Sequence, residues 1–166
     1  MIPVQIVGAP FDLCGLRLGS RLGPAAVRLA GLRPALEGAG LEVRDPGDPV
    51  YTHDATEGPG LRHFDALFVA LKGTRDRVTA AFETGAFPLV LGGEHTLSAA
   101  SVGAALDATS GDLAVLWIDA HADINTPGSS DTGNIHGMPI AALAGMDSET
   151  DDARTDPFPA NYLPRK

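Results

Sequence analysis

The sequence of 166 residues contains a single cysteine and no long hydrophobic run. Because Cys14 has no partner in the chain, an intrachain disulfide is excluded, and a small half-buried hydrophobe is a commoner role for it than a nucleophile. No apolar stretch approaches the roughly 20 residues that a membrane helix requires. The amino terminus has no basic segment ahead of its short apolar run, so it indicates a strand rather than a signal peptide. We therefore expect a cytoplasmic protein without redox chemistry and without a membrane partner.

Basic residues are also scarce, since 12 lysines and arginines stand against 21 aspartates and glutamates and give a net charge of −9. This balance argues against binding to nucleic acid or to an anionic membrane surface, and it is compatible with a cationic substrate. Apolar residues make up 44% and charged residues 20% of the chain, which is typical of a globular protein and excludes a disordered one. The length fits one domain of ordinary size.

Short strand-like runs recur along the chain. Two of them are almost wholly apolar, as strands are in a parallel sheet that is covered on both faces. The runs are residues 3–7, 41–45, 87–93 and 113–119. We predict a strand at each of them.

Helical segments separate these runs. Residues 23–40 have a proline near their start and glycines at their end, which is typical of a helix, although Pro34 could break it. From Phe64 onward, apolar residues recur at helical spacing and predict one long amphipathic helix. Those residues are Leu67, Phe68, Leu71, Val78 and Phe82. Further helices are expected from about residue 95 to 106 and over residues 138–145.

The alternation of strand and helix predicts an α/β fold with a mostly parallel sheet. The last twenty or so residues differ from the rest, because they are polar, acidic at first, and without periodicity. We expect residues 1–146 to form one domain and residues 147–166 to form a polar tail or linker stub.

Ionisable side chains follow two of the apolar runs, at the ends of strands where active sites of α/β sheets lie. Asp119, His121 and Asp123 occupy alternate positions, so an extended backbone would place them on one face. Desolvating three such groups without a cation is costly, which favours a metal site over a structural salt-bridge cluster. Two glycines after the run 87–91 allow a tight turn that would bring His95 to the same place.

Two imidazoles and at least two carboxylates suit a hard to borderline ion such as Mn²⁺. A carboxylate can bridge two ions, and a pair about 3.5–4 Å apart can share a water and lower its pKa. His136, in a glycine-flanked loop, is ambiguous by itself, whereas His53 and His63 are expected to be surface or capping residues. The glycine-rich segment before His95 lacks the Lys-Ser/Thr of a P-loop, so phosphate binding is not favoured.

Four segments resemble, in order and with similar spacing, the amino-terminal half of the arginase and agmatinase (ureohydrolase) family. They are "GAPFDL…GPAAVR", "FPLVLGGEHT", "WIDAHADINTP" and "TGNIHGMPIAAL". The resemblance spans residues 3 to about 145 and is closer to bacterial-type arginase than to agmatinase. It implies a three-layer α/β/α fold and a binuclear Mn²⁺ centre. It also implies hydrolysis of L-arginine to L-ornithine and urea by a metal-bridging hydroxide, in an enzyme that is a homo-oligomer when complete.

The resemblance assigns roles to individual residues. His95, Asp119 and Asp123 would bind one manganese ion. His121 and the bridging Asp119 would bind the other. His136 would be the proton shuttle, because a histidine pKa lies near the operating pH, and we count it with Asp123 as catalytic.

Substrate contacts are implied in the same way. Asn125 and the hydroxyl of Thr132 would contact the α-carboxylate of the substrate, with Ser130 near by. Two positions depart mildly from the family, which more often has Asp at the position of Glu94 and Ser at that of Thr132. Because agmatine lacks a carboxylate, the Asn125 and Thr132 pair favours arginine over agmatine, which remains an alternative together with other guanidino substrates.

The larger departure is a missing half. Family members are about twice as long, and neither the later strand end with two aspartates nor the later glutamate that binds the guanidinium occurs here. We therefore expect this chain to hold at most one ion, and weakly, since hydration competes with an incomplete ligand set. A non-catalytic metal-binding or interaction fragment is the second hypothesis.

The strand order of the family has a consequence for folding. It would place the missing strands between residues 87–93 and 113–119, so these two runs would either expose their inner edges or pair with each other. We expect the isolated chain to be marginally stable, prone to aggregation and inactive toward arginine.

Overall fold

Parallel strands form the sheet in the part of the chain that the computed structural model describes, residues 2–15, 18–51 and 63–146. β1 (Val4–Ala9) lies in the middle, between β2 (Val43–Arg44) and β3 (Phe87–Gly92). β1 and β3 pair along their whole length, from Val4 opposite Phe87 to Ala9 opposite Gly92. Because the strands are parallel, their carboxyl ends lie at one edge of the sheet, and the loops that follow them meet there.

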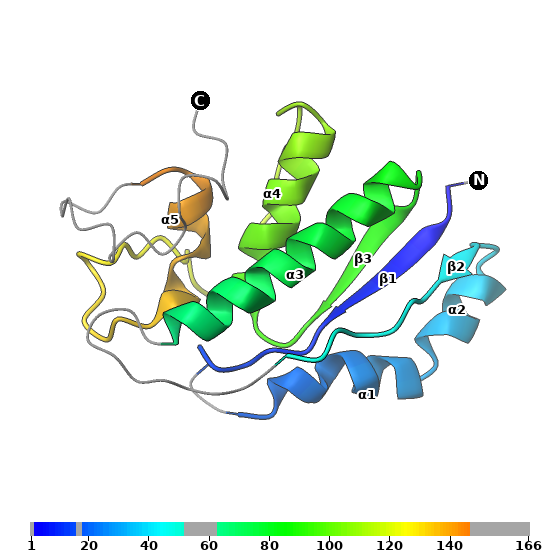
Figure 1. Cartoon of the computed structure of the whole chain (residues 1–166), viewed down its shortest axis with the longest axis horizontal. Coiled ribbons are helices and arrows are strands. Elements are labelled where there is room, and N and C mark those ends of the chain that lie inside the picture. Colours follow the sequence, from blue (N-terminus) through cyan, green and yellow to red (C-terminus); the bar gives the residue numbers. More distant parts are fainter. Residues whose placement is uncertain (1, 16–17, 52–62, 147–166) are drawn as a thin grey trace.

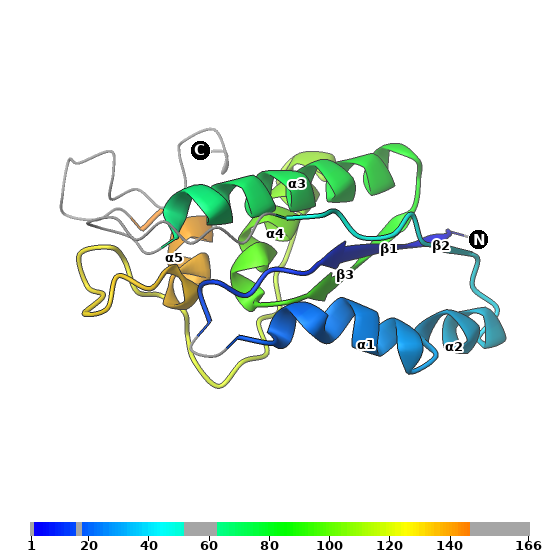
Figure 2. The ribbon, with the colours of Figure 1, turned by 60° about the horizontal axis from the view of Figure 1, so that its bottom comes forward.

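Helices cover both faces of this sheet, as Figures 1 and 2 show. α1 (Gly23–Leu29) and α2 (Leu32–Gly38) lie on one face. α3 (Phe64–Glu83) lies on the other, with α4 (Ser98–Ala108) packed against it. The short α5 (Pro139–Leu143) contacts α4. The expected α/β class with a parallel sheet is confirmed, and the helices form layers above and below it.

The core lies between β1 and α3. Ile6 and Val7 are fully buried, and α3 buries Leu67, Leu71 and Val78, three of the residues whose spacing predicted it. The predicted long helix from Phe64 is therefore confirmed. Cys14 is fully buried in the core, whereas the sequence predicts a half-buried small hydrophobe.

The helix expected over residues 23–40 is two helices. The chain turns at Gly31, whose φ of 96° is a left-handed conformation that glycine adopts without strain. Pro34 lies in the first turn of α2, where its missing N–H costs nothing because that turn has no intrahelical acceptor. The break thus falls ahead of the proline and not at it.

Two predicted strands need correction. Within residues 41–45 only Val43–Arg44 is a strand, because it pairs only with the start of β1 before the chain turns away. Residues 113–118 are not a strand at all, and Leu116 and Ile118 are 85% and 87% exposed. A strand needs a neighbour for its backbone hydrogen bonds, and β3 pairs only with β1 among the described residues. Residues 87–92 and 113–118 therefore do not pair with each other, and β3 has one edge without a strand partner among the described residues.

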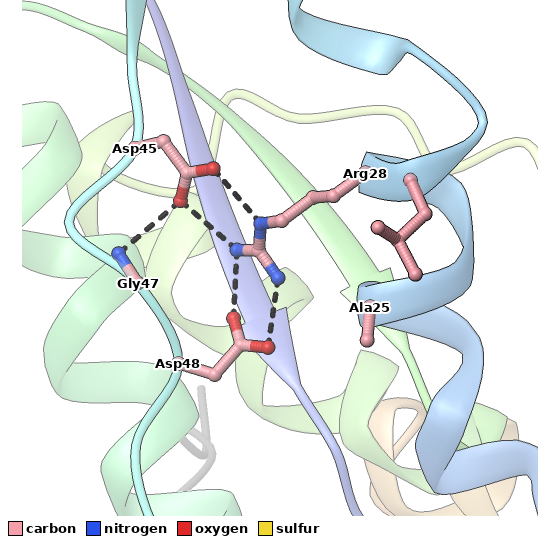
Figure 3. A pocket seen from close by; sticks show the side chains of 6 residues that line it. Ala25, Arg28, Asp45, Gly47 and Asp48 are labelled. Atoms are coloured by element: carbon pink, nitrogen blue, oxygen red, sulfur yellow. Dashed lines mark hydrogen bonds and ion pairs between the residues drawn. The ribbon is translucent and has the colours of Figure 1, made fainter.

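Arg28 ties α1 to the segment after β2 (Figure 3). Its Nε–H donates to Asp45 at 2.8 Å, and both of its terminal nitrogens contact Asp48 at 2.7 Å. These two carboxylates hold the Arg28 pKa above its usual value, and the guanidinium holds the pKa of Asp45 below its own. A shallow pocket lies here, lined by Ala25 and Leu29 besides these charged residues. Because its charged groups are paired with one another and fix the chain after β2, we interpret the pocket as structural.

The remaining sequence expectations concern single residues and the tail. His63 precedes α3, and its side chain makes no capping hydrogen bond. His53 and residues 147–166 lie outside the described residues. Across the described ranges, no helix combines the length and apolar character needed to cross a bilayer.

Candidate metal centre

The loop after β3 is held against the end of β1 by a glycine. A Cβ on Gly93 would lie 2.1 Å from the carbonyl oxygen of Phe11, closer than any side chain permits. The next residue, Glu94, donates its backbone N–H to that same oxygen at 2.9 Å. This close approach sets the start of the 3₁₀ turn η2 (His95–Leu97) at the carboxyl edge of the sheet.

Three of the four predicted metal ligands come together at this edge. His95, Asp119 and Asp123 each offer one ligand atom, and these atoms all lie within 4.8 Å of one another. The Nδ1 of His95 is 3.2 Å from Asp119 Oδ2, and its Nε2 is 3.6 Å from Asp123 Oδ2. Two ligand atoms that share one ion lie about 3 Å apart when each is about 2.1 Å from it. The donor set and the 3.2 Å between His95 Nδ1 and Asp119 Oδ2 therefore fit a divalent cation, while Asp123 lies on the side of the other ring nitrogen.

A neighbouring carbonyl group determines which nitrogen of His95 can bind a metal. Its Nε2 is 2.7 Å from the carbonyl oxygen of His136. Because a carbonyl can only accept, Nε2–H donates to it, which leaves Nδ1, on the side of Asp119, as the nitrogen that would bind a metal. A backbone acceptor that fixes the tautomer in this way is typical of histidines that bind metals.

Hydrogen bonds stabilise the two aspartates as carboxylates. The backbone N–H of His121 donates to Asp119 Oδ1 at 2.9 Å and holds the pKa of Asp119 below its usual value. The indole N–H of Trp117 donates to Asp123 Oδ2 at 3.2 Å. Asp123 is buried, and its backbone oxygen accepts from the first amides of α5. Each carboxylate thus accepts a hydrogen bond that fixes its orientation at the site.

His121 lies outside the group that the other three ligands form. Its side chain is 81% exposed, and its Nδ1 is 3.4 Å from Asp119 Oδ1. The segment is not extended, since Asp123 has a φ of 51°, so the alternation that would place three side chains on one face is broken. The structure therefore assembles one incomplete site.

His136 lies directly against this site, in the 3₁₀ turn η3 (Ile135–Gly137). Its ring stacks on that of His95, with centroids 4.1 Å apart and planes inclined by 11°. Its Nδ1 is 2.9 Å from Oε2 of Glu94, and this hydrogen bond raises the pKa of His136 against the opposing effect of burial. The sequence does not predict this contact. The position of Glu94, in a glycine-rich turn directly before a candidate metal ligand, is the one sequence feature that could have suggested a functional role for it.

The proposed substrate contacts lie on the loop between Asp123 and η3. Asn125 donates its backbone N–H to the Gly137 oxygen at 3.0 Å, which joins this loop to η3. Thr132 is exposed, and its hydroxyl accepts from the backbone of Asn134 at 3.3 Å. Ser130 is half-buried. The three residues thus lie on one loop, which is anchored at its base to η3.

The chain matches the Arginase family over residues 2–153. It is 41% identical over 147 residues to an arginase of Staphylococcus aureus, covering 86% of this chain and 48% of that protein. An arginase of Brevibacillus brevis is 38% identical over 148 residues, covering 88% and 49%. The solved arginase of Bacillus caldovelox superposes with a TM-score of 0.80 at 34% identity, covering 95% and 54%. The chain thus spans about half the length of the relatives it matches.

Proposed function

The chain belongs to the arginase family, and from that premise we propose that it forms the amino-terminal part of a manganese-dependent arginase, which hydrolyses L-arginine to L-ornithine and urea. The observation that carries the proposal is the group of His95, Asp119 and Asp123 at the carboxyl edge of the sheet. Relatives with 38% and 41% identity that are named arginase support it. Because the chain spans about half of their length, the activity is proposed for the complete protein.

The metal would be held by Nδ1 of His95 and by the carboxylates of Asp119 and Asp123. One imidazole with two carboxylates suits Mn²⁺ better than ions that prefer thiolate. A bound divalent cation supplies a Lewis acid that lowers the pKa of water. With His121 turned outward, we propose that this chain holds at most one ion weakly, and that the two ions of the complete enzyme need ligands from elsewhere.

The other residues would bind substrate and move protons. His136 is 34% exposed at its side chain, so its ring can exchange a proton with solvent or with a leaving group. Asn125, Ser130 and Thr132 would bind the α-carboxylate of arginine through amide and hydroxyl groups. We place these roles on residues 1–146 as one domain, with residues 147–166 as a tail or linker. We keep a cytoplasmic, homo-oligomeric enzyme as part of the proposal.

A guanidino substrate other than arginine, such as agmatine, is the first alternative. The measurement that separates the two is urea release by the complete protein with added Mn²⁺, from arginine and from agmatine in parallel. We expect faster release from arginine, and Thr132→Val should weaken the apparent affinity for arginine more than for agmatine, because only arginine carries the carboxylate. Faster release from agmatine would overturn the choice of substrate.

A non-catalytic metal-binding or interaction fragment is the second alternative. The outward position of His121 favours it, because the group then binds one ion without the second. The coding sequence downstream of Lys166 distinguishes the two hypotheses. A continuation that encodes an aspartate-rich strand end would support the enzyme, and its absence would support the fragment.

A further inference from the structure

Glu94 has a buried carboxylate with one hydrogen-bond partner. Its side chain is 2% exposed, and its Oε2 lies 2.9 Å from Nδ1 of His136. Its other oxygen, Oε1, has no hydrogen-bond partner among the described residues. A buried carboxylate that is only half satisfied is costly, so its presence calls for an explanation other than stability.

The backbones on both sides of this contact are fixed. Glu94 donates its N–H to the end of β1, where Gly93 allows the close approach. His136 is held by its own N–H, which donates to the Asn134 side chain at 3.3 Å, and by the stacked ring of His95. The positions of the Glu94 carboxylate and the His136 imidazole are therefore fixed relative to each other.

We propose that Glu94 is a positioning residue that holds His136 in a single ring orientation and tautomer, with Nδ1–H donated to Glu94 and Nε2 left as the acceptor for a transferred proton. The identification of His136 as the proton shuttle rests on the proposed function, whereas the orientation rests on the distances above. A carboxylate can only accept from the ring, so it selects the Nδ1–H form. Without it, either nitrogen could carry the proton and the ring could turn over.

Glu94→Gln is the informative variant, because it preserves the shape of the side chain and removes the preference for the Nδ1–H tautomer of His136. A glutamine amide can accept from Nδ1–H or donate to a bare Nδ1, so both tautomers become possible. At an alkaline pH, where His136 is neutral, the same change removes a buried charge that is half satisfied, so we expect the thermal unfolding midpoint measured there to stay or to rise by a few degrees. A residue that served only stability would lower that midpoint when replaced.

The test is the nitrogen NMR spectrum of histidine-labelled full chain, without metal and at an alkaline pH where imidazole is neutral. The His136 signals are identified by their loss in His136→Gln. In the parent chain we expect one tautomer with the proton on Nδ1, and in Glu94→Gln and Glu94→Ala we expect that single species to be lost. Glu83→Gln, at the exposed end of α3, is the matched control and should leave the His136 signals unchanged.

Either of two results would overturn the proposal. One is a parent chain in which the proton of His136 lies on Nε2, a measurement that needs no variant to fold. The other is a folded Glu94→Gln chain that keeps the Nδ1–H form alone. Titration of the same chain with Mn²⁺, followed by the fluorescence of Trp117, tests the proposed function separately. A chain that binds no Mn²⁺ but loses the Nδ1–H form in Glu94→Gln would refute the metal site and support the positioning role.

Discussion

The ring of His95 stacks on the ring of His136, and the same His95 donates its Nε2–H to the backbone oxygen of His136. One contact uses the side chain of His136 and the other uses its main chain. The candidate metal ligand is therefore oriented by the residue proposed to move protons beside it. Replacing the His136 side chain removes the stacking but leaves the carbonyl acceptor, so the tautomer of His95 should survive that change.

Metal binding should depend most on Asp119. We expect titration calorimetry of the isolated chain with Mn²⁺ to show at most one weakly bound ion. Asp119→Ala should weaken binding about tenfold or more, since it removes one of three ligands. His136→Ala should weaken it less, because the carbonyl acceptor of His95 remains. Asp112→Asn, on an exposed residue after α4, is the control and should bind as the parent does. Two tightly held ions, or unchanged binding by Asp119→Ala, would show that the ligand assignment is wrong.

The turn at Gly93 should tolerate no side chain. A Cβ there would lie 2.1 Å from a backbone oxygen, which cannot move without displacing β1. We expect Gly93→Ala to lower the free energy of unfolding by about 3 kcal/mol and to abolish Mn²⁺ binding. Gly38→Ala is the matched control, because nothing lies within 4 Å of its Cβ and the helix conformation favours alanine by about 0.5 kcal/mol. Urea denaturation should therefore show a lower free energy of unfolding for Gly93→Ala and a slightly higher one for Gly38→Ala. Equal stability of the two variants would contradict the packing argument.

The network around Arg28 should make stability depend on pH in the acid range. The pKa of Asp45 is lowered in the folded state, so its contribution is fully present above the usual aspartate pKa of about 3.9 and is lost as the pH falls through the lower folded value. Arg28→Gln should cost about 2 kcal/mol near neutral pH and flatten this acid dependence. Arg33→Gln removes an exposed pair with Glu37 and should change stability by less than about 0.5 kcal/mol. The free energy of unfolding of Arg28→Gln is measured as a function of pH. If it depends on acid pH as that of the parent chain does, other carboxylates are responsible for the dependence.

Aggregation of the isolated chain should arise at residues 113–118. Leu116 and Ile118 are 85% and 87% exposed, and among the described residues β3 has one edge without a strand partner. We expect Leu116→Lys and Ile118→Lys to reduce light scattering on concentration by several-fold. Leu29→Lys, at a side chain that is 89% exposed on α1, is the control and should have little effect. Equal improvement by all three would mean that added charge alone, and not this segment, decides the outcome.

The isolated chain should release no urea from arginine, even with excess Mn²⁺. Its described residues bring together only His95, Asp119 and Asp123, an incomplete ligand set for a binuclear centre. A colorimetric urea assay with a complete arginase as the positive control checks this. Urea release by a monomeric chain would show that the missing ligands come from residues that we have not assigned.

The sequence predicts those helices and strands whose hydrophobic pattern lies within a single segment of the chain. The apolar run of β1 and the helical spacing of α3 predict these elements correctly, because the pattern of burial is encoded within each segment. The same kind of pattern predicts a strand at residues 113–119, and this prediction is wrong. A strand is stabilised by its neighbour, and the apolar pattern of this run does not tell whether that neighbour is present.

At the site, residue types could be predicted and their orientations could not. The grouping of His95 with Asp119 and Asp123 followed from the strand ends, and the structure brings them together. The outward position of His121 depends on the positive φ of Asp123, which no spacing reveals. The contact of Glu94 with His136 joins residues 42 positions apart through the placement of η3, so it could only be found in three dimensions.

Asp123 takes part in both the candidate metal centre and the start of α5. Its carboxylate belongs to the ligand group, while its carbonyl oxygen accepts the amides of Ile140 and Ala141 at 3.0 and 3.2 Å. A rotation of the side chain alone would move the carboxylate and leave these backbone hydrogen bonds intact. A shift of the Asp123 backbone, which has a left-handed φ of 51°, would disturb the ligand group and the start of α5 together. This one residue therefore joins the candidate metal centre to a helix that supplies none of its ligands.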